Sequence, residues 1–393
     1  MFMKNRKRKL TALVLILVLV SVMYGCQDSA KGTVKQIRTM ITSSGKPLLV
    51  DSVSEGNYAY ETLDEDTRLV YDEIVYAIQN REEEVRIATT DVSVMEKAYM
   101  AVRYDYCNFF WLEKFSYVTY RKGKNITAID ITPVYSVSEK EQESLQAKIE
   151  NEAKHMLADA PVDGTDYEKA LYVYETLIEQ VDYDETSENN QNILSVFLNH
   201  RTICQGYAYA TQYLLERLGI PCTTVVGTAE GENHAWNLIQ LDGAYYYMDT
   251  TWGNSQYMYR DSGESAQSVK GKKFIDYDYM AVDTETLMDT HQADPTIPLP
   301  ECTESKDNYY VHEGKYFASW DPEKIGDVIR TAYEQGEKQV QIKFSDMELY
   351  EQAFQYFVEN YHIEDYCSGL DTLRYLENSG NNVLFLQFSS EEE

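Results

Sequence analysis

The sequence predicts an α+β protein, and three observations support this fold class. Apolar residues recur at helical spacing between residues 165 and 181. Residues 92–134 alternate apolar and polar side chains in the manner of strands. Residues 223–251 are rich in strand-forming residues and contain an Asp-Gly pair at 242–243, which is a strong signal for a β-hairpin.

The chain is long enough to hold several domains. It has 393 residues, of which 44% are hydrophobic, so two or three cores can be buried. The charged fraction of 25% is ordinary for a folded protein. We expect a leader at residues 1–25, a tether at 26–57, an N-terminal α+β region at 58–160, a central domain at 161–260, a connecting segment with a Pro-rich linker at 261–300, and a small α/β domain at 301–393.

The charge balance limits the kinds of partner. The chain carries 65 acidic and 35 basic residues, for a formal net charge of −30. A nucleic-acid partner is therefore not expected, because phosphates require a basic surface. We interpret the acidity as a solubility device rather than a cation-binding surface. No CxxC pair or Cys/His cluster is present, so we expect no metal site, and no cofactor is expected.

The N-terminus has the pattern of an export signal. A basic run from Lys4 to Lys9 precedes an almost wholly apolar stretch at residues 10–23. This stretch is shorter than the roughly 20 residues that a spanning helix needs. The sequence VMYGC at 22–26 resembles the lipobox of bacterial lipoproteins, although Tyr24 stands where a small residue is usual. We expect lipidation of Cys26, a membrane contact through that lipid, and a location outside the cytoplasm; a secreted protein with an ordinary signal peptide is the alternative.

Local signals place the other elements. The sequence TDYE at 165–168 has the form of a capping box, which starts a helix. The helix expected at 204–218 ends at Gly219, with Pro221 beyond it. Further helices are expected at 60–80, 138–157, 192–199, 276–290, 321–334 and 347–361, and further strands at 340–344 and 383–388.

Cys204 is the first candidate for chemistry. It begins the predicted helix in the sequence CQGYA at 204–208. A helix N-terminus offers unpaired N–H groups and a partial positive charge, both of which favour a thiolate. The thiolate is the nucleophilic form of cysteine, and the same N–H groups can hold an oxyanion. Its backbone N–H is one expected donor to that oxyanion; Gln191 and Asn192 lie upstream, but the sequence does not show which group is the second.

His234 and Asp249 are the second and third candidates. They occur in HAWN at 234–237 and DTTW at 249–252, on the two arms of the predicted hairpin. With a two-residue turn, Trp236 lies opposite Asp249, and His234 becomes a diagonal neighbour of Asp249 on the same face. A carboxylate so placed can fix the tautomer of an imidazole whose other nitrogen faces a nucleophile. A one-residue change of register would put the two side chains on opposite faces.

These three motifs, in this order, resemble the transglutaminase-like superfamily. The resemblance covers about residues 160–255 and implies a papain-like core, in which a helix that bears the cysteine packs on an antiparallel sheet. It implies Cys204 as nucleophile, His234 as general base and acid, and Asp249 as the orienting group. Superfamily members include crosslinking enzymes, cysteine peptidases, peptide N-glycanases and inactive scaffolds.

Other residues are candidates for lesser roles. Gln205, Gly206, Trp236 and Trp252 are candidate substrate-pocket residues, although the tryptophans also suit a core. His200 is an alternative base, but we expect it on an exposed loop. The acidic loop at 182–188 could bind calcium, yet it lacks EF-hand spacing, and a solvated loop is preferred. Cys302 and Cys367 could form a disulfide, and no residue spacing suggests the paired carboxylates of a glycosidase.

The sequence thus predicts a lipid-anchored cysteine enzyme that acts on amide bonds of peptide or protein substrates through a thioester. Hydrolysis by a peptidase or amidase is favoured over crosslinking, because no feature excludes water or recruits an amine. A binding or scaffold lipoprotein of the cell envelope, with the same fold and no turnover, is the alternative.

Overall fold

The computed structural model describes residues 16–21, 34–38, 56–254, 274–370, 372–378 and 381–389, with side chains from residue 56 onward except at 376–378 and 389. Cys26 and most of the predicted leader and tether lie outside the described residues. Two compact units are present. The first contains residues 1–162, 180–238 and 290–300, and the second contains 163–179, 239–289 and 301–393.

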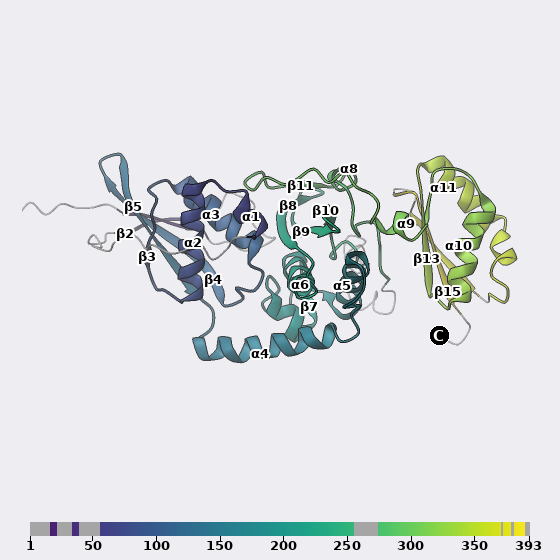
Figure 1. Cartoon of the computed structure of the whole chain (residues 1–393), viewed down its shortest axis with the longest axis horizontal. Helices are drawn as coiled ribbons and strands as arrows, with labels where there is room; N and C mark the ends of the chain where they lie inside the picture. The colour runs from purple at the N-terminus through teal and green to yellow at the C-terminus, as the bar shows by residue number, and fades with distance from the viewer. Residues whose placement is uncertain are drawn as a thin grey trace, which may run out of the picture. The chain divides into compact units, whose positions relative to one another are not determined.

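The N-terminal region of the first unit combines helices with an antiparallel sheet (Figure 1). Helices α2 and α3 pack against each other. The ring of Tyr99 on α3 stacks on Phe115 of β4 with 4.3 Å between centroids, which fixes α3 on the sheet. The sheet has the order β2-β1-β4-β5-β3. The bounds are β1 Ile16–Ser21, β2 Val34–Arg38, α1 Tyr58–Glu61, α2 Glu65–Gln79, β3 Val85–Arg86, α3 Val92–Asp105, β4 Leu112–Lys122 and β5 Asn125–Tyr135.

One predicted element in this region is wrong. The alternation of apolar and polar residues predicts strands from residue 92 onward, but residues 92–105 form helix α3. Asp91 caps this helix by accepting from the backbone N–H of Ser93 at 2.8 Å. Met95, Ala98 and Val102 are buried at helical spacing, so packing of this face outweighs the strand preference of the Val and Tyr residues.

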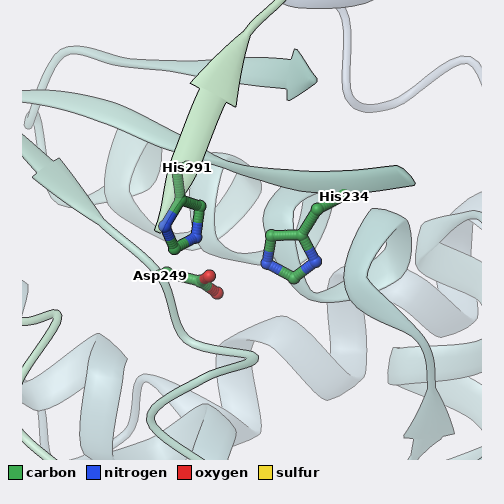
Figure 2. Close-up of side chains that lie close together, drawn as sticks. All are labelled: His234, Asp249 and His291. Atoms are coloured by element: carbon green, nitrogen blue, oxygen red, sulfur yellow. The ribbon is translucent and has the colours of Figure 1, made fainter. Parts of the chain in front are cut away.

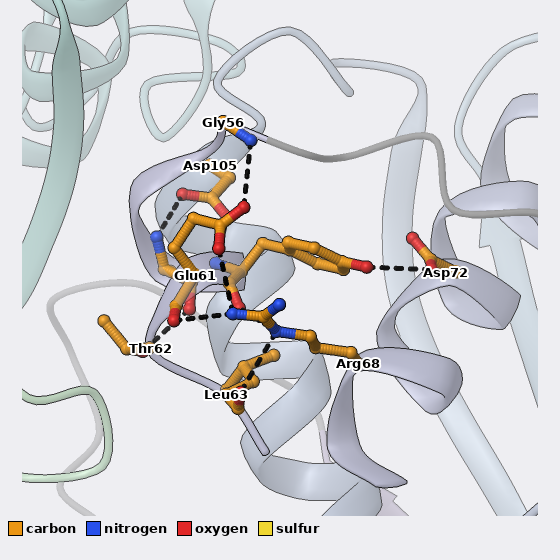
Figure 3. A network of polar contacts seen from close by, with 9 residues as sticks. Gly56, Glu61, Thr62, Leu63, Arg68, Asp72 and Asp105 are labelled. Carbon is orange, nitrogen blue, oxygen red and sulfur yellow. Dashed lines mark hydrogen bonds and ion pairs between the residues drawn. The ribbon is translucent and has the colours of Figure 1, made fainter. Parts of the chain in front are cut away.

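The carboxylate of Asp105, the last residue of α3, binds the backbone of helix α1. This carboxylate accepts from the backbone N–H groups of Ala59 at 2.8 Å and Tyr60 at 2.9 Å, and from the phenol of Tyr71 at 2.8 Å. Burial nevertheless raises the pKa of Asp105 to about 6. Figure 3 shows Asp105 beside α1, together with Arg68, which donates to Glu61 at 2.9 Å.

Glu73 on α2 is a fully buried carboxyl group. One oxygen accepts from the backbone N–H of Ala88 at 2.8 Å, and the other has no hydrogen-bond partner. Burial, only partly offset by that hydrogen bond, raises the pKa of Glu73 from 4.5 to about 7.

We predict that Glu73→Gln removes a pH dependence of folding. The folded protein binds the Glu73 proton more tightly than the unfolded chain, so this group favours folding below about pH 4.5 and loses that effect as the pH rises to about 7. At pH 8 the variant should be more stable by up to about 3 kcal/mol, since glutamine is neutral and still accepts from Ala88. Urea unfolding at pH 5 and pH 8 measures this. The exposed Glu83→Gln is the control, and an equal response of both variants would contradict the prediction.

The central region forms around helix α6 and a four-stranded sheet of order β10-β9-β8-β11. Thr224 on β8 donates to the side chain of Gln212 on α6 at 2.8 Å, and Asn237 on β9 donates to the carbonyl of Ala208 on α6 at 3.0 Å. These buried bonds fix the helix on the sheet. The bounds are α4 Glu139–Met156, α5 Asp166–Gln180, β6 Asp182–Tyr183, η1 Ser195–Asn199, β7 Arg201–Thr202, α6 Cys204–Arg217, β8 Cys222–Ala229, β9 Glu232–Leu241, β10 Ala244–Met248, α8 Thr284–Met288 and β11 His291–Ala293.

The predicted capping box and hairpin turn are both present. The Glu168 side chain accepts from the N–H of Thr165 at 2.7 Å, and the Thr165 hydroxyl accepts from the N–H of Glu168 at 3.2 Å. Asp242 and Gly243 have φ angles of 48° and 86°, as a two-residue turn with left-handed geometry requires. This turn joins β9 to β10.

The C-terminal part of the second unit is a small α/β arrangement, as predicted. Its sheet has the order β12-β13-β15-β14. Helix α10 begins at Pro322, and Asp321 caps it by accepting from the N–H of Lys324 at 3.2 Å. Apolar residues of α10, α11, β13 and β15 form one buried core. The bounds are α9 Tyr309–His312, β12 Tyr316–Phe317, α10 Pro322–Glu334, β13 Gln339–Phe344, α11 Met347–Phe354, η2 Gln355–Glu359, η3 His362–Asp365, β14 Thr372–Asn378 and β15 Val383–Ser389.

No helix within the described ranges is both long enough and apolar enough to cross a membrane.

Candidate active site

Cys204 is the first residue of α6 and is 2% exposed. The preceding Ile203 is extended, and its side chain makes no capping hydrogen bond to the first N–H groups of the helix. The helix has 14 residues, which is long enough for a substantial dipole at this end. The sulfur therefore lies where the backbone favours a negative charge.

Gly206 has a packing role beside Cys204. A Cβ atom at this position would lie 1.9 Å from the hydroxyl of Thr202 and 3.2 Å from the carbonyl of Asn190. The close approach holds the 190–192 segment against the start of α6, where the Thr202 hydroxyl donates to the Asn190 carbonyl at 2.8 Å. Glycine is required here for close approach of protein groups.

His234 and Asp249 come together, as Figure 2 shows. Both are buried, and a ring nitrogen of His234 and a carboxylate oxygen of Asp249 lie within 4.8 Å of each other. One Asp249 oxygen accepts from the backbone N–H groups of Thr251 at 2.8 Å and Trp252 at 3.2 Å. These two bonds set the orientation of the carboxylate. The catalytic roles of Cys204, His234 and Asp249 stay a prediction.

His291 is a neighbour that sequence reasoning missed. It lies on β11, which pairs with β8, and is buried. Its ring centroid lies 5.4 Å from that of His234 and 5.0 Å from that of Trp236. The Thr290 hydroxyl lies 2.8 Å from the Nδ1 atom of His291. No motif surrounds His291 in the sequence, so only the strand pairing could have located it.

His234, Asp249 and His291 form a donor set that suits a metal ion. One potential ligand atom from each lies within 4.8 Å of the others. Two imidazoles and a carboxylate are ligands that zinc accepts. His234 and Asp249 are also the groups that a Cys-His-Asp triad requires, so the same donors fit either use. The expectation that no metal is bound stays a prediction.

The other candidates occupy different surroundings. Trp236 is buried in the first unit, with its ring beside His291, while Trp252 is partly buried in the second unit and contacts Tyr279 edge to face. His200 has a left-handed φ of 52° and lies 3.5 Å from the Glu152 carboxylate. In the acidic loop, Asp184 accepts from the Thr186 hydroxyl at 2.6 Å.

The five described cysteines are all present as thiols, so the suggested Cys302–Cys367 disulfide is not formed. Burial raises the pKa of Cys302 and Cys367 to about 11. Burial also raises the pKa values of Cys107 and Cys222 well above the usual range.

We predict that iodoacetamide modifies Cys204 first. At pH 7 the other four cysteines of the described residues remain protonated because of burial, whereas the N-terminus of α6 favours a thiolate at Cys204. Peptide mapping after brief alkylation between pH 5 and pH 9 gives the rate at each cysteine. An apparent pKa for Cys204 of about 8.5 or above, as in a free thiol, would show that this thiol is not activated.

Sequence comparison identifies the class of this domain. Residues 157–250 match the family model described as the transglutaminase-like superfamily, and this segment is a transglutaminase-like domain. The α+β core with its cysteine-bearing helix packed on an antiparallel sheet agrees with that class.

Two curated proteins match this chain at low sequence identity and over a short segment. Kyphoscoliosis peptidase from Homo sapiens is 24% identical over 107 residues, a match that covers 23% of this chain and 16% of that protein. The Mus musculus protein is 23% identical over the same length and the same shares. The chain therefore spans only a small part of these curated relatives.

Two solved structures are also similar. One described as a TGase has 16% identity and a TM-score of 0.26, and the match covers 36% of this chain and 44% of the other. One from Cytophaga hutchinsonii, provisionally described as a cysteine protease, has 17% identity and a TM-score of 0.24, and the match covers 35% and 57%. The class assignment rests on the family model.

Proposed function

We propose that the transglutaminase-like domain is a cysteine enzyme that cleaves amide bonds of peptides or proteins. The observation that carries this proposal is the placement of His234 beside Asp249 in a buried site, on a sheet that packs against the helix begun by Cys204. The superfamily match and the name of the curated relatives, which are peptidases, support the same reaction class.

The proposed reaction proceeds in two halves. His234 takes the proton of the Cys204 thiol, and the sulfur attacks the amide carbonyl carbon, while N–H groups at the start of α6 bind the oxyanion. The C–N bond then breaks, and the amine leaves with the proton from His234, so that a thioester remains. Water attacks the thioester after giving a proton to His234; the acid is released, and the thiolate recovers the proton. Asp249 holds the imidazole and stabilises its protonated form.

Hydrolysis is preferred to crosslinking in this proposal. Both reactions share the thioester, and an amine in place of water would give a new amide. The described residues give no reason to expect an amine site, so water is the simpler acceptor. Mass spectrometry of glutamine-containing peptides, with and without an added primary amine, distinguishes the two. Fragments whose masses sum to the peptide plus one water are expected; identical products from wild type and Cys204→Ala would contradict any enzymatic role for this thiol.

We also propose that the protein is anchored outside the cytoplasm by a lipid on Cys26. The motif at residues 22–26 supports this proposal. In a bacterial host, the Cys26→Ser substitution should move the protein from the membrane into the soluble extracytoplasmic fraction, which cell fractionation measures. Membrane retention equal to that of wild type would contradict the anchor.

A further inference from the structure

A cavity of about 450 Å³ lies in the first unit at the start of helix α6. Residues 189–192 and Gln205, which follows Cys204 in the chain, form part of its lining. Most of the remaining lining comes from residues 99–114, which belong to the N-terminal region and lie outside the segment that matches the superfamily. The N-terminal region therefore shapes a cavity next to the first turn of the nucleophile helix.

Two polar side chains in this lining present hydrogen-bond donors. A guanidinium N–H of Arg103 donates to the Oε1 atom of Gln205 at 3.0 Å, which fixes the orientation of the amide. The Nε2 group of Gln205 is consequently directed elsewhere, and it is buried with no hydrogen-bond partner. Gln205 as a whole is 5% exposed, so solvent is largely excluded from the amide. A buried donor without a partner favours a ligand that brings an acceptor oxygen.

The charge of the lining points to the same kind of ligand. Arg103 and Lys114 are basic and Glu113 is acidic, so the lining carries a formal charge of +1 in a chain of charge −30. The side chains of Lys114 and Glu113 are 39% and 53% exposed, lie 3.9 Å apart and largely offset each other's charge. Arg103 interacts electrostatically with the phenols of Tyr99 and Tyr104, and burial raises the pKa of each of these phenols to about 12, so that both are neutral at pH 7. Arg103 is therefore the basic group of the lining that lies beside the Gln205 amide.

We propose that this cavity is the subsite for an acidic side chain of the peptide substrate, with Arg103 and Gln205 binding its carboxylate. Arginine suits this task because its planar fork of N–H groups matches the geometry of a carboxylate. Aromatic rings of Tyr106 and Phe109, stacked with 4.5 Å between centroids, belong to the same lining and suit the apolar part of the side chain. This inference rests on the proposed function, because it names the substrate class of that active site.

The test uses internally quenched peptides of Ala and Gly in which one Glu, or one Gln, is moved through every position. Wild type should prefer Glu to Gln about tenfold or more in kcat/KM at one position, as charge-assisted hydrogen bonds imply. In Arg103→Gln this ratio should fall about tenfold or more, and Arg103→Lys should keep part of it. Arg121→Gln is the matched control, since it removes the same charge from an exposed residue of β4 outside the lining.

Binding separates this inference from the proposed function. Calorimetry with Cys204→Ala and the same peptides reports recognition without turnover. Tighter binding of the Glu peptide, lost on adding Arg103→Gln, supports the subsite even if wild type cleaves nothing. Equal binding of Glu and Gln peptides at every position would overturn the subsite, whereas cleavage by wild type would leave the proposed function intact. Thermal unfolding of each variant verifies that it is folded.

Discussion

Replacing any member of the proposed triad should remove most of the amide-cleaving activity, to a different extent for each residue. Cys204→Ala is expected to abolish cleavage, since no thioester can form. His234→Ala should lower kcat by about 10²–10⁴-fold, the usual contribution of a general acid and base. These losses should occur without a matching loss of folding stability.

Asp249→Asn is the most informative of these variants. The backbone N–H groups of Thr251 and Trp252 can still bond to the asparagine oxygen, so the side chain keeps its orientation. The amide then presents N–H instead of an acceptor, which reverses the preferred tautomer of the imidazole. We expect a loss in kcat of about 10²-fold or more. Steady-state kinetics on one cleaved peptide, with circular dichroism of each variant, measures the effect.

His200→Ala is the control for the identity of the base. His200 lies in the first unit beside Glu152, with its side chain 43% exposed, and it is not part of the proposed triad. Its replacement should leave kcat/KM within about twofold of wild type. A loss similar to that of His234→Ala would assign the base to His200 and refute the triad.

Gly227→Ala should be among the most destabilising single substitutions. A Cβ atom on Gly227 would lie 2.1 Å from the carbonyl oxygen of Gln292 and 2.8 Å from the Cα of Ala293, which are backbone atoms of β11. The same Cβ atom would lie 2.9 Å from the ring of Trp236, so the new methyl group has no free space on that side either. Strands β8 and β11 would have to separate, at a cost of about 3 kcal/mol.

Thermal unfolding measures this prediction. A loss of that size should lower Tm by about 4 °C in a protein of 393 residues, because the unfolding entropy is about 2.1 cal/mol/K per residue. Gly314→Ala provides a comparison, because no atom lies within 4 Å of its Cβ position and only its φ of +66° opposes a side chain. It should cost about 1 kcal/mol. Equal effects of the two substitutions would show that the β8–β11 approach is not tightly packed.

The part of the site that the local sequence predicts comes from one continuous segment of the chain, which contains α6, β9 and β10. An Asp-Gly turn requires left-handed geometry at both positions, and the observed φ angles of Asp242 and Gly243 show it. A two-residue turn determines which residues of β9 and β10 are neighbours. The start of α6 at Cys204 is likewise predicted from the order of its residues, with Gly219 and Pro221 ending the helix.

The remaining neighbours depend on contacts between distant parts of the chain. His291 lies near His234 because β11 pairs with β8, and nothing in its local sequence indicates that pairing. Arg103 lies beside Gln205 because α3 packs against β8 within the first unit. The local sequence of α3 predicts a strand instead of a helix. The Val and Tyr residues of this segment favour strands locally, and only burial of one helical face selects the helix.

The absence of disulfides among the five described cysteines has a consequence for how this part of the chain matures. None of its stability comes from a covalent crosslink, so it can reach its fold without an oxidative folding catalyst. Refolding should give the same yield with or without a reducing agent. If the protein is exported, its thiols would need protection from oxidants, and the raised pKa values of Cys107 and Cys367 provide it by keeping these thiols protonated. Cys204 would then be the thiol most readily inactivated by mild oxidation, which couples activity to the redox state of the surroundings.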